Sequence, residues 1–159
     1  MAATNRQYLE DFSEGQVFDS GRLRVDKEAI IAFAKQFDPQ PYHLDEEMAR
    51  LSPFGRLVAS GWHTAALTMR LLVEGAFRPA NGIIGVGFDE LSWPRPVYPG
   101  DELRTRSEVL EVRPSKSRPD RGLVRVRTTT LNQNDEPVQI YVARLIVPRR
   151  PDRRIAEQR

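Results

Sequence analysis

Residues 37–45 read Phe-Asp-Pro-Gln-Pro-Tyr-His-Leu-Asp, so a carboxylate and a histidine stand five positions apart with two prolines between them. Each proline fixes its own φ at about −65° and disfavours the helical conformation in the residue before it. We therefore expect Asp38 and Gln40 to be extended. A carboxylate and the neutral imidazole of His43 on one rigid loop can orient and deprotonate water, or deliver a proton. Alternatively, Asp38 caps a turn and His43 fills a polar niche, because turns favour Asp and Pro for local reasons.

Apolar spacing predicts a helix directly before this stretch. Asp26 is a candidate N-cap, and apolar residues follow it at helical spacing, namely Ile30, Phe33, Ala34 and Phe37. Pro39 is expected to end this helix. A further helical turn is possible over residues 46–51, inside a loop rich in polar residues and proline.

Gly61 opens the most apolar helix of the chain, which we expect from about Trp62 to Glu74. Its principal apolar face carries Trp62, Ala65, Ala66, Met69, Leu72, Val73 and Ala76, while Leu67 and Leu71 lie elsewhere on its circumference. Most of this helix is therefore expected to be buried. A helix surrounded by protein on nearly all sides is typical of a fold in which a sheet wraps around it.

The second half of the chain supplies such a sheet. Segments 83–88, 103–112, 123–131 and 138–147 are rich in Val, Ile, Leu and Thr, and turn signals separate them; a short strand is also expected within residues 16–25. The last three segments are too close together for helical crossovers, so they predict antiparallel pairing. The final segment is largely apolar on both faces, and a second copy of the chain is the economical cover for its outer face.

These elements predict an α+β fold, with an antiparallel sheet wrapped around a long central helix. A chain of 159 residues suffices for one domain. We assign residues 1–148 to this domain and 149–159 to a charged, frayed C-terminal tail. The apolar runs are too short for a membrane span, and the N-terminus lacks the pattern of a secretory signal.

The absence of cysteine excludes thiolate catalysis, disulfides and cysteine-bound metal, and is compatible with a cytoplasmic location. Two histidines without a clustered pair of carboxylates give too few ligands for a familiar metal site, so no metal is expected. We interpret the second histidine, His63, as a packing residue or as a support for the site.

Basic residues are concentrated in the second half of the chain. Residues 1–89 carry 9 basic and 12 acidic side chains, whereas residues 90–159 carry 15 and 10. A cluster around one predicted turn contains Arg113, Lys116, Arg118 and Arg121. Such a cluster can receive phosphates of a nucleic acid or of a nucleotide-bearing molecule, or it can simply be a solvated loop. The chain has no RNP motif, zinc finger or basic helix, so nucleic-acid binding is not expected.

Taken in order, the short helix, the Asp-x-x-x-x-His loop, the helix opened by Ala59-Ser60-Gly61-Trp62 and the long antiparallel sheet resemble one known family. This is the MaoC-like, or (R)-specific enoyl-CoA hydratase ("hydratase 2"), branch of the hotdog fold. The resemblance covers residues 8–148 and is sharpest over residues 38–45. It implies a lyase of fatty acid metabolism that adds water to a trans-2-enoyl-CoA to give an (R)-3-hydroxyacyl-CoA, or catalyses the reverse dehydration. It also implies acyl-CoA or acyl carrier protein as the partner, coenzyme A only as part of the substrate, no other cofactor, and a homodimer or higher homo-oligomer.

The resemblance assigns catalytic roles to three residues. Asp38 and His43 match the family's catalytic pair, which shares one water. The backbone N–H of Gly61, at the first turn of a helix, would stabilise the enolate-like oxygen of the thioester. Gly61 also lacks a Cβ, which lets a carbonyl approach its backbone closely. Alternatively, Gly61 only allows a tight turn into the helix, with Ser60 as N-cap.

The substrate-binding residues are expected to be Gln40, Ser60 and Trp62, with Lys116 and Arg118 contacting coenzyme A phosphates. Two of them depart from the family's pattern. Much of the family has Asn at the position of Gln40, and often His at the position of Ser60. These departures concern substrate range more than reaction type. Two other functions are compatible with the fold: a hotdog acyl-CoA thioesterase and a non-catalytic acyl-thioester-binding module.

Overall fold

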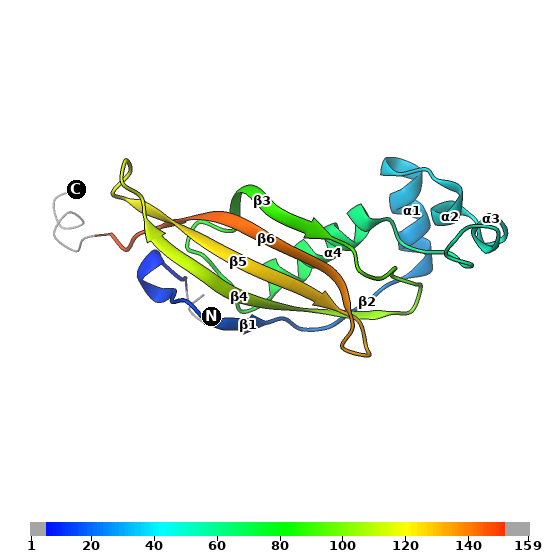
Figure 1. Cartoon of the computed structure of the whole chain (residues 1–159), viewed down its shortest axis with the longest axis horizontal. Coiled ribbons are helices and arrows are strands. Elements are labelled where there is room, and N and C mark those ends of the chain that lie inside the picture. Colours follow the sequence, from blue (N-terminus) through cyan, green and yellow to red (C-terminus); the bar gives the residue numbers. More distant parts are fainter. Residues whose placement is uncertain (1–5, 152–159) are drawn as a thin grey trace, which may run out of the picture.

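An antiparallel sheet curls around helix α4 in the computed structural model, which describes residues 6–151 (Figure 1). The sheet has six strands: β1 (Val17–Asp19), β2 (Leu23–Arg24), β3 (Ile84–Ser92), β4 (Glu102–Pro114), β5 (Arg121–Leu131) and β6 (Pro137–Pro148). The helices are η1 (Leu9–Asp11), α1 (Lys27–Phe37), α2 (Pro41–Leu44), α3 (Glu46–Arg50) and α4 (Gly61–Glu74). The order across the sheet is β1-β4-β5-β6-β3, with β2 also paired to β4. The α+β fold predicted from the sequence is confirmed.

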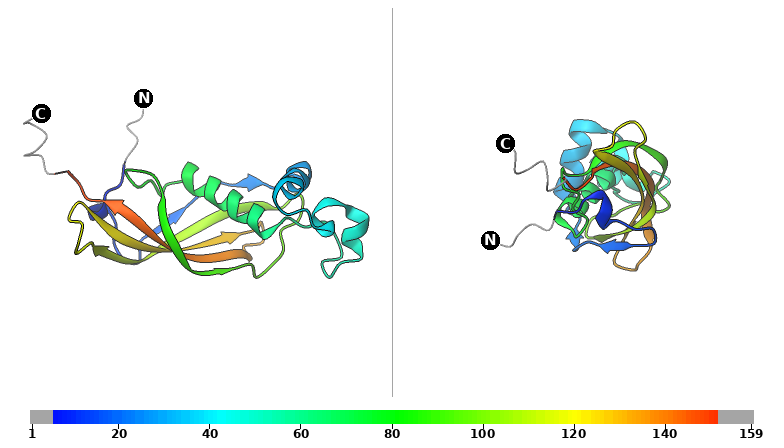
Figure 2. Two further views of the ribbon diagram at one scale, coloured as in Figure 1. Left: turned by 90° about the horizontal axis from the view of Figure 1, so that it is seen from above. Right: turned by 90° about the vertical axis from the view of Figure 1, so that its left-hand side faces the viewer.

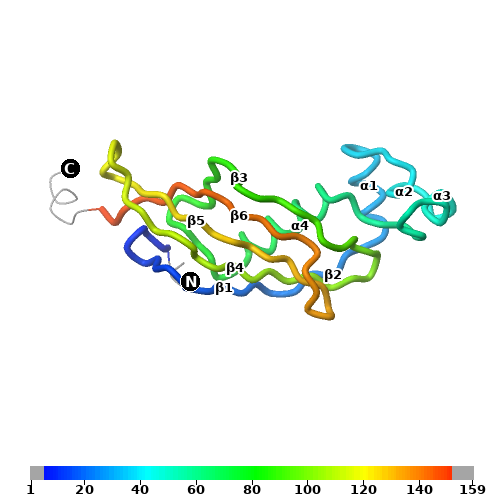
Figure 3. The backbone as a smooth tube through the Cα atoms, viewed as in Figure 1, coloured from blue at the N-terminus to red at the C-terminus, as the bar shows by residue number. Residues whose placement is uncertain are grey.

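The elements are distributed unevenly along the molecule. Helix α4 lies along one face of the sheet, as Figure 2 shows from above. Helices α1, α2 and α3 gather at one end, and the turn between β4 and β5 lies at the other end, as the backbone tube shows (Figure 3). Within residues 6–151, none of the helices has the length and apolar content needed to cross a bilayer.

The strands of the second half agree with the predicted segments and mostly run further, whereas two short strands, β1 and β2, lie where one was expected within residues 16–25. The largest difference is β3, which was predicted to stop at Phe88 and continues to Ser92, with register shifts after Gly85 and Phe88. The extension contains Asp89, whose charge argues against a strand. On the sheet this carboxylate forms ion pairs with Arg125 and Arg144, each at 3.1 Å. The charge is thus accommodated by partners that are distant in sequence.

The helical predictions were correct except at α2. Asp26 caps α1 by accepting a hydrogen bond from the backbone N–H of Ala29, and the helix ends before Pro39. Helix α3 forms where one helical turn was expected. The short helix α2 was not predicted, because proline was read only as a helix breaker. Here Pro41 is the first residue of the helix, where its missing N–H costs nothing.

The face of α4 predicted to be buried is mostly wrong, since of its residues on the helix only Leu72 is buried, and most of the helix is not buried as expected. Trp62, Met69 and Val73 are 59%, 40% and 60% exposed, and the buried residues are His63, Thr64, Thr68, Leu71 and Leu72. The sheet opposite α4 explains the difference, because its inner face carries the buried polar residues Thr105, Ser107, Thr128, Thr130 and Gln139. Helix α4 therefore turns its hydroxyl-bearing side inward and leaves its apolar stripe outward. Hydrophobic periodicity locates such a stripe but does not say which way it faces.

Two clusters of buried apolar residues form the core. One cluster includes Leu9, Phe12, Leu72, Phe77 and Leu145, and the other includes Ile30, Leu57, Leu71, Leu103 and Val138. Gly122 permits β5 to lie close to β4, because a Cβ at this position would lie 2.6 Å from the backbone oxygen of Arg113 and would also meet the side chain of Leu9. The second cluster contains Ile30, through which α1 packs against the rest of the core.

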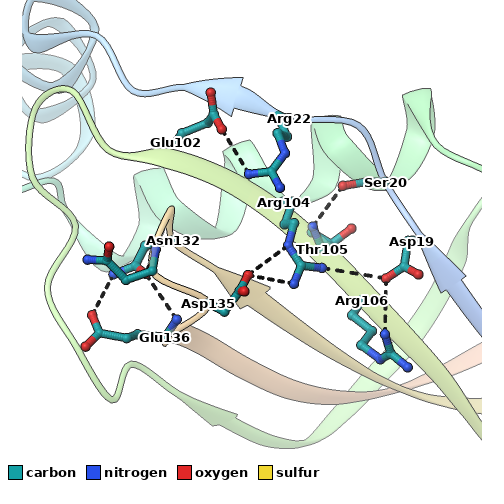
Figure 4. A network of polar contacts seen from close by, with 11 residues as sticks. Asp19, Ser20, Arg22, Glu102, Arg104, Thr105, Arg106, Asn132, Asp135 and Glu136 are labelled. Carbon is teal, nitrogen blue, oxygen red and sulfur yellow. Dashed lines mark hydrogen bonds and ion pairs between the residues drawn. The ribbon is translucent and has the colours of Figure 1, made fainter.

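A network of ion pairs and hydrogen bonds links β1 and the residue after it to β4 (Figure 4). Arg104 forms ion pairs with Asp135 at 2.8 Å and with Asp19 at 3.8 Å. The backbone N–H of Thr105 donates to Ser20 Oγ at 2.8 Å. These contacts join β1, β4 and the turn between β5 and β6.

The start of the predicted C-terminal tail is held in place. Arg149 forms an ion pair with Glu10 at 3.0 Å, and Arg150 forms one with Asp11 at 2.6 Å. Residues 152–159 of the predicted tail lie outside the described residues.

His63 gives the fold a sensitivity to acid. Its ring is buried and stacks on Phe33, with centroids 4.8 Å apart, and its Nδ1 has no hydrogen-bond partner among residues 6–151. Burial lowers the pKa of His63. The unfolded chain, with an ordinary histidine pKa of about 6.5, therefore binds a proton before the folded chain does. The free energy of unfolding should fall as the pH drops below about 6.5.

His63→Phe keeps an aromatic ring against Phe33 and removes the titrating group. We expect its free energy of unfolding, measured by urea titration at neutral and mildly acidic pH, to depend less on pH than that of the wild type. Equal losses in the two proteins would show that His63 is not the source of the acid sensitivity.

Candidate active site

The end of α1 and the start of α2 place Asp38 and His43 on one loop. The backbone N–H of Asp38 still donates to Ala34 O, but its φ and ψ of −149° and 69° leave the helical region. Gln40 is extended, with φ and ψ of −90° and 145°. The chain then turns at Pro41, and the N–H of His43 donates to Gln40 O. Gln40 is therefore extended as predicted, whereas Asp38 leaves the helical region without becoming extended. The turn between them brings the carboxylate and the imidazole back together.

The imidazole of His43 has a defined tautomer. Its Nδ1 lies 2.7 Å from the carbonyl oxygen of Val58. A carbonyl only accepts hydrogen bonds, so Nδ1 carries the hydrogen and the neutral ring has its lone pair on Nε2. Nε2 lies 3.3 Å from Asp38 Oδ2. Two acceptors thus lie side by side, and a water placed next to both can donate one hydrogen to each.

Asp38 is held in its ionised form. Its Oδ2 accepts a hydrogen bond from Ser60 Oγ at 2.7 Å, and its Oδ1 accepts one from Gln40 Nε2 at 2.8 Å. The Ser60 hydrogen bond is the main cause that lowers the pKa of Asp38, against burial; the Gln40 hydrogen bond acts in the same direction, as does His43 whenever its ring is protonated. The structure favours the carboxylate at neutral pH.

Gln40 and Ser60 therefore both act on Asp38. Gln40 is itself held by Tyr42, whose hydroxyl donates to Gln40 Oε1 at 2.5 Å. Ser60 is buried, and its Oγ also accepts from the backbone N–H of Trp62 at 3.2 Å, which makes it the N-cap of α4. One hydroxyl thus caps the helix and orients the carboxylate.

Gly61 begins α4 directly beside this carboxylate. Its backbone N–H has no acceptor among residues 6–151, and it stands at the positive end of the helix dipole. The space left by the absent side chain is filled by Trp93, whose indole carbons would lie 2.7 to 3.0 Å from a Cβ. The glycine is therefore required by Trp93, which occupies the space that we expected a substrate carbonyl to use. The role of the free N–H stays a prediction.

A pocket of about 490 Å³ opens over these groups. Its lining includes five of the predicted site residues, Asp38, Gln40, His43, Gly61 and Trp62, and Ser60 lies buried beneath Asp38. Lys116 and Arg118 are not brought to this pocket. They line a separate pocket of about 470 Å³ at the turn between β4 and β5. This turn lies at the end of the molecule opposite to α1, α2 and α3 (Figure 3). Their contact with coenzyme A phosphates stays a prediction.

Several residues of the site were missed by the sequence analysis, among them Tyr42, which holds Gln40. Trp93 lines the pocket at the end of β3, Phe54 lines it on the other side, and Val58 fixes the His43 tautomer. A signal existed for Trp93, because Trp93-Pro94-Arg95-Pro96 combines an aromatic residue with two prolines, as the first loop does. No signal existed for Val58, which acts through its backbone carbonyl.

Comparison with known proteins agrees with this arrangement. The family model described as "MaoC like domain" matches residues 11–132. The crystal structure of a MaoC-like dehydratase from Rhodospirillum rubrum is 58% identical, with a TM-score of 0.89 over 92% of this chain and 99% of that chain.

Two curated proteins extend the comparison. The uncharacterized protein YdeM of Bacillus subtilis is 37% identical over 139 residues, which are 87% of this chain and 96% of that protein. A 3-hydroxybutyryl-CoA dehydratase of Methylorubrum extorquens is 30% identical over 112 residues, which are 70% of this chain and 69% of that protein. Because the family model covers most of the chain, and the fold and the loop geometry agree with it, the chain belongs to the MaoC-like domain family.

Proposed function

We propose that this protein is a hydratase/dehydratase of acyl thioesters, which adds water to a trans-2-enoyl-CoA to give an (R)-3-hydroxyacyl-CoA or catalyses the reverse reaction. The observation that carries the proposal is the gap of 3.3 Å between His43 Nε2 and Asp38 Oδ2. Both atoms are acceptors, and both are fixed by further hydrogen bonds, so together they are suited to hold and activate one water. The dehydratase names of two of the similar proteins support the same reaction class.

The geometry suggests how the addition proceeds. The pair takes one proton from the bound water as its oxygen forms a bond to Cβ of the enoyl group. The π electrons move towards Cα and the thioester carbonyl, whose oxygen becomes enolate-like. The free N–H of Gly61 at the start of α4 is placed to stabilise that oxygen. The pair then returns one proton to Cα, on the face from which the water came, because both groups lie on one loop.

The first test removes each member of the pair. Asp38→Asn and His43→Ala should each lower kcat/KM for crotonyl-CoA hydration by at least about a hundredfold, the usual contribution of a positioned acid or base. The loss of enoyl absorbance measures the rate. Asp45→Asn is a matched control, since Asp45 lies on the same loop but only caps α3, a role that Asn also fills.

Full activity in either pair variant would sink the assignment. Release of free thiol from acyl-CoA, without hydration, would instead identify a thioesterase. Saturable acyl-CoA binding without turnover would identify a binding module.

The second test concerns the charge of Asp38. Ser60 is the main cause of its lowered pKa, so Ser60→Ala should raise that pKa. Because the carboxylate is the active form, activity is lost as the pH falls through this pKa, and the variant should lose activity at a higher pH than the wild type. A profile of kcat/KM from about pH 4 to pH 8 measures the shift. Ser60→Thr, which keeps a hydroxyl, should restore the wild-type profile, and an unmoved acidic limb in Ser60→Ala would contradict the role of Ser60.

We also propose that the protein is a homodimer. Strand β3 is an edge of the sheet, and its Ile84, Val86 and Phe88 are exposed. Met69 of the outward stripe on α4 lines the same cavity as Phe88, so the stripe and the edge strand form one apolar surface. A surface of this kind, beside an unpaired strand edge, favours association with a second copy.

The proposed dimer interface is tested by introducing a charged residue into the apolar stripe of α4. Val73→Glu should convert the dimer to a monomer in size-exclusion chromatography with light scattering, because a carboxylate is costly to bury in an apolar interface. Leu51→Glu introduces the same charge at an exposed apolar residue outside this surface and should leave the dimer intact. A monomeric wild type, or a dimeric Val73→Glu variant, would argue against this interface.

A further inference from the structure

A row of hydrogen-bonded side chains crosses the space between α4 and the sheet. Trp93 Nε1 donates to Gln139 Oε1 at 2.8 Å, and Gln139 Nε2 donates to Thr68 Oγ1 at 3.2 Å. Thr68 Oγ1 then lies 2.6 Å from Thr130 Oγ1. Gln139, Thr68 and Thr130 have no measurable exposure. We call these four residues the polar row.

The orientation of Gln139 in the polar row is fixed by chemistry. The indole N–H of Trp93 only donates, so Gln139 must turn its oxygen to Trp93 and its amide nitrogen to Thr68. A buried amide is costly unless both its ends are satisfied. Gln139 therefore holds the indole in one position, against the backbone of Gly61, and Trp62 packs edge-on against the same ring at 5.2 Å.

The polar row stands between two cavities. On one side is the pocket of Asp38 and His43. On the other is an apolar cavity of about 130 Å³, whose lining includes Met69, Leu72, Phe77, Phe88, Tyr141 and Leu145. This volume is close to that of an engineered apolar cavity of about 150 Å³ that binds benzene. The second cavity is thus large enough for several methylene groups.

Along four elements that line this space, the residue of the polar row lies on the same side of the residues that line the second cavity. On α4, residues 61–64 reach the first pocket, Thr68 follows, and Met69 and Leu72 line the second cavity. On β6, Gln139 comes before Tyr141, Ala143 and Leu145, which line the second cavity. On β5, Thr130 lies beyond Val126 and Thr128, and Trp93 directly follows β3, beyond Gly85, Gly87 and Phe88. The polar row is therefore a partition.

We propose that this partition ends the acyl-binding part of the site, so that the protein selects short 2-enoyl groups. The inference rests on the proposed function. A chain of four carbons stops before the row, whereas a longer chain must displace the indole of Trp93 or break the buried bonds of Gln139. Trp93 is then a specificity-determining residue, and Gln139 is a positioning residue that acts through it. Opening the partition gives a longer acyl chain access to the apolar cavity.

The experiment compares two substrates and several variants. The wild type should hydrate crotonyl-CoA with a higher kcat/KM than trans-2-octenoyl-CoA. Gln139→Ala and Trp93→Leu should each raise the octenoyl-to-crotonyl ratio of kcat/KM by at least about tenfold, the size of effect that one methylene has in an apolar pocket. Trp93→Phe keeps an aromatic wall and should stay close to the wild-type ratio.

Ser107→Ala is the matched control. Ser107 is buried on the same face of the sheet and bonds to Thr128 at 2.9 Å, but it lies outside the polar row. Its loss should leave the substrate ratio unchanged. Circular dichroism shows whether each variant is folded, and the two opening variants test the partition independently of each other.

A binding measurement separates this inference from the proposed function. Calorimetric titration with the saturated butyryl-CoA and octanoyl-CoA needs no turnover. Octanoyl-CoA should gain affinity relative to butyryl-CoA in the opening variants and not in Ser107→Ala. Hydration of crotonyl-CoA with the same ratio in Gln139→Ala, Trp93→Leu and Ser107→Ala would overturn the partition. Absence of hydration, together with the expected shift in binding, would reject the hydratase and keep the partition.

Discussion

The hydrogen bond from Ser60 Oγ to Asp38 Oδ2 is the contact on which the site depends. It joins the end of α1 to the beginning of α4, two segments that are far apart in the sequence. The same hydroxyl caps α4, so the position of the helix and the position of the carboxylate are set by one atom. A carboxylate that accepts such hydrogen bonds is stabilised in its charged form. The fold thus sets the chemistry of Asp38 through the N-terminus of its central helix.

The polar residues on the inner face of the sheet explain why the apolar stripe of α4 faces outward. A sheet that wraps a helix ordinarily meets it with apolar side chains, whereas here Thr, Ser and Gln side chains are buried beneath α4. Hydroxyls and amides in such a place are tolerated only when they bond to one another, which fixes their positions more tightly than apolar packing does. The polar side of α4 must face them. Its apolar stripe is consequently left for the outer surface, beside the edge of β3.

Much of the fold was predictable because it depends on local signals. The strands followed from runs of branched residues, α1 from its cap and spacing, and the turn at residues 38–43 from two prolines. The pairing of Asp38 with His43 was predictable for the same reason, since one short loop carries both. What failed depends on contacts between distant residues: the buried face of α4, the length of β3, and the place of Trp93. The tautomer of His43 is set by the backbone carbonyl of Val58. Because every residue type has a backbone carbonyl, no sequence pattern predicts this contact.

Gln40 and Ser60, the two residues expected to differ from the family's pattern, act on the same carboxylate. Gln40 and Ser60 seemed to concern the water or the substrate, but each donates its hydrogen bond to a different oxygen of Asp38. Gln40 is long enough to reach Oδ1 while Tyr42 holds its other end. Both residues therefore favour the charged carboxylate and restrict its rotation. Because His43 already offers its lone pair from Nε2, a fixed carboxylate leaves one position in which a water can bond to both groups. The two oxygens of the carboxylate are thus each held by one side chain, while the imidazole is held by a backbone carbonyl.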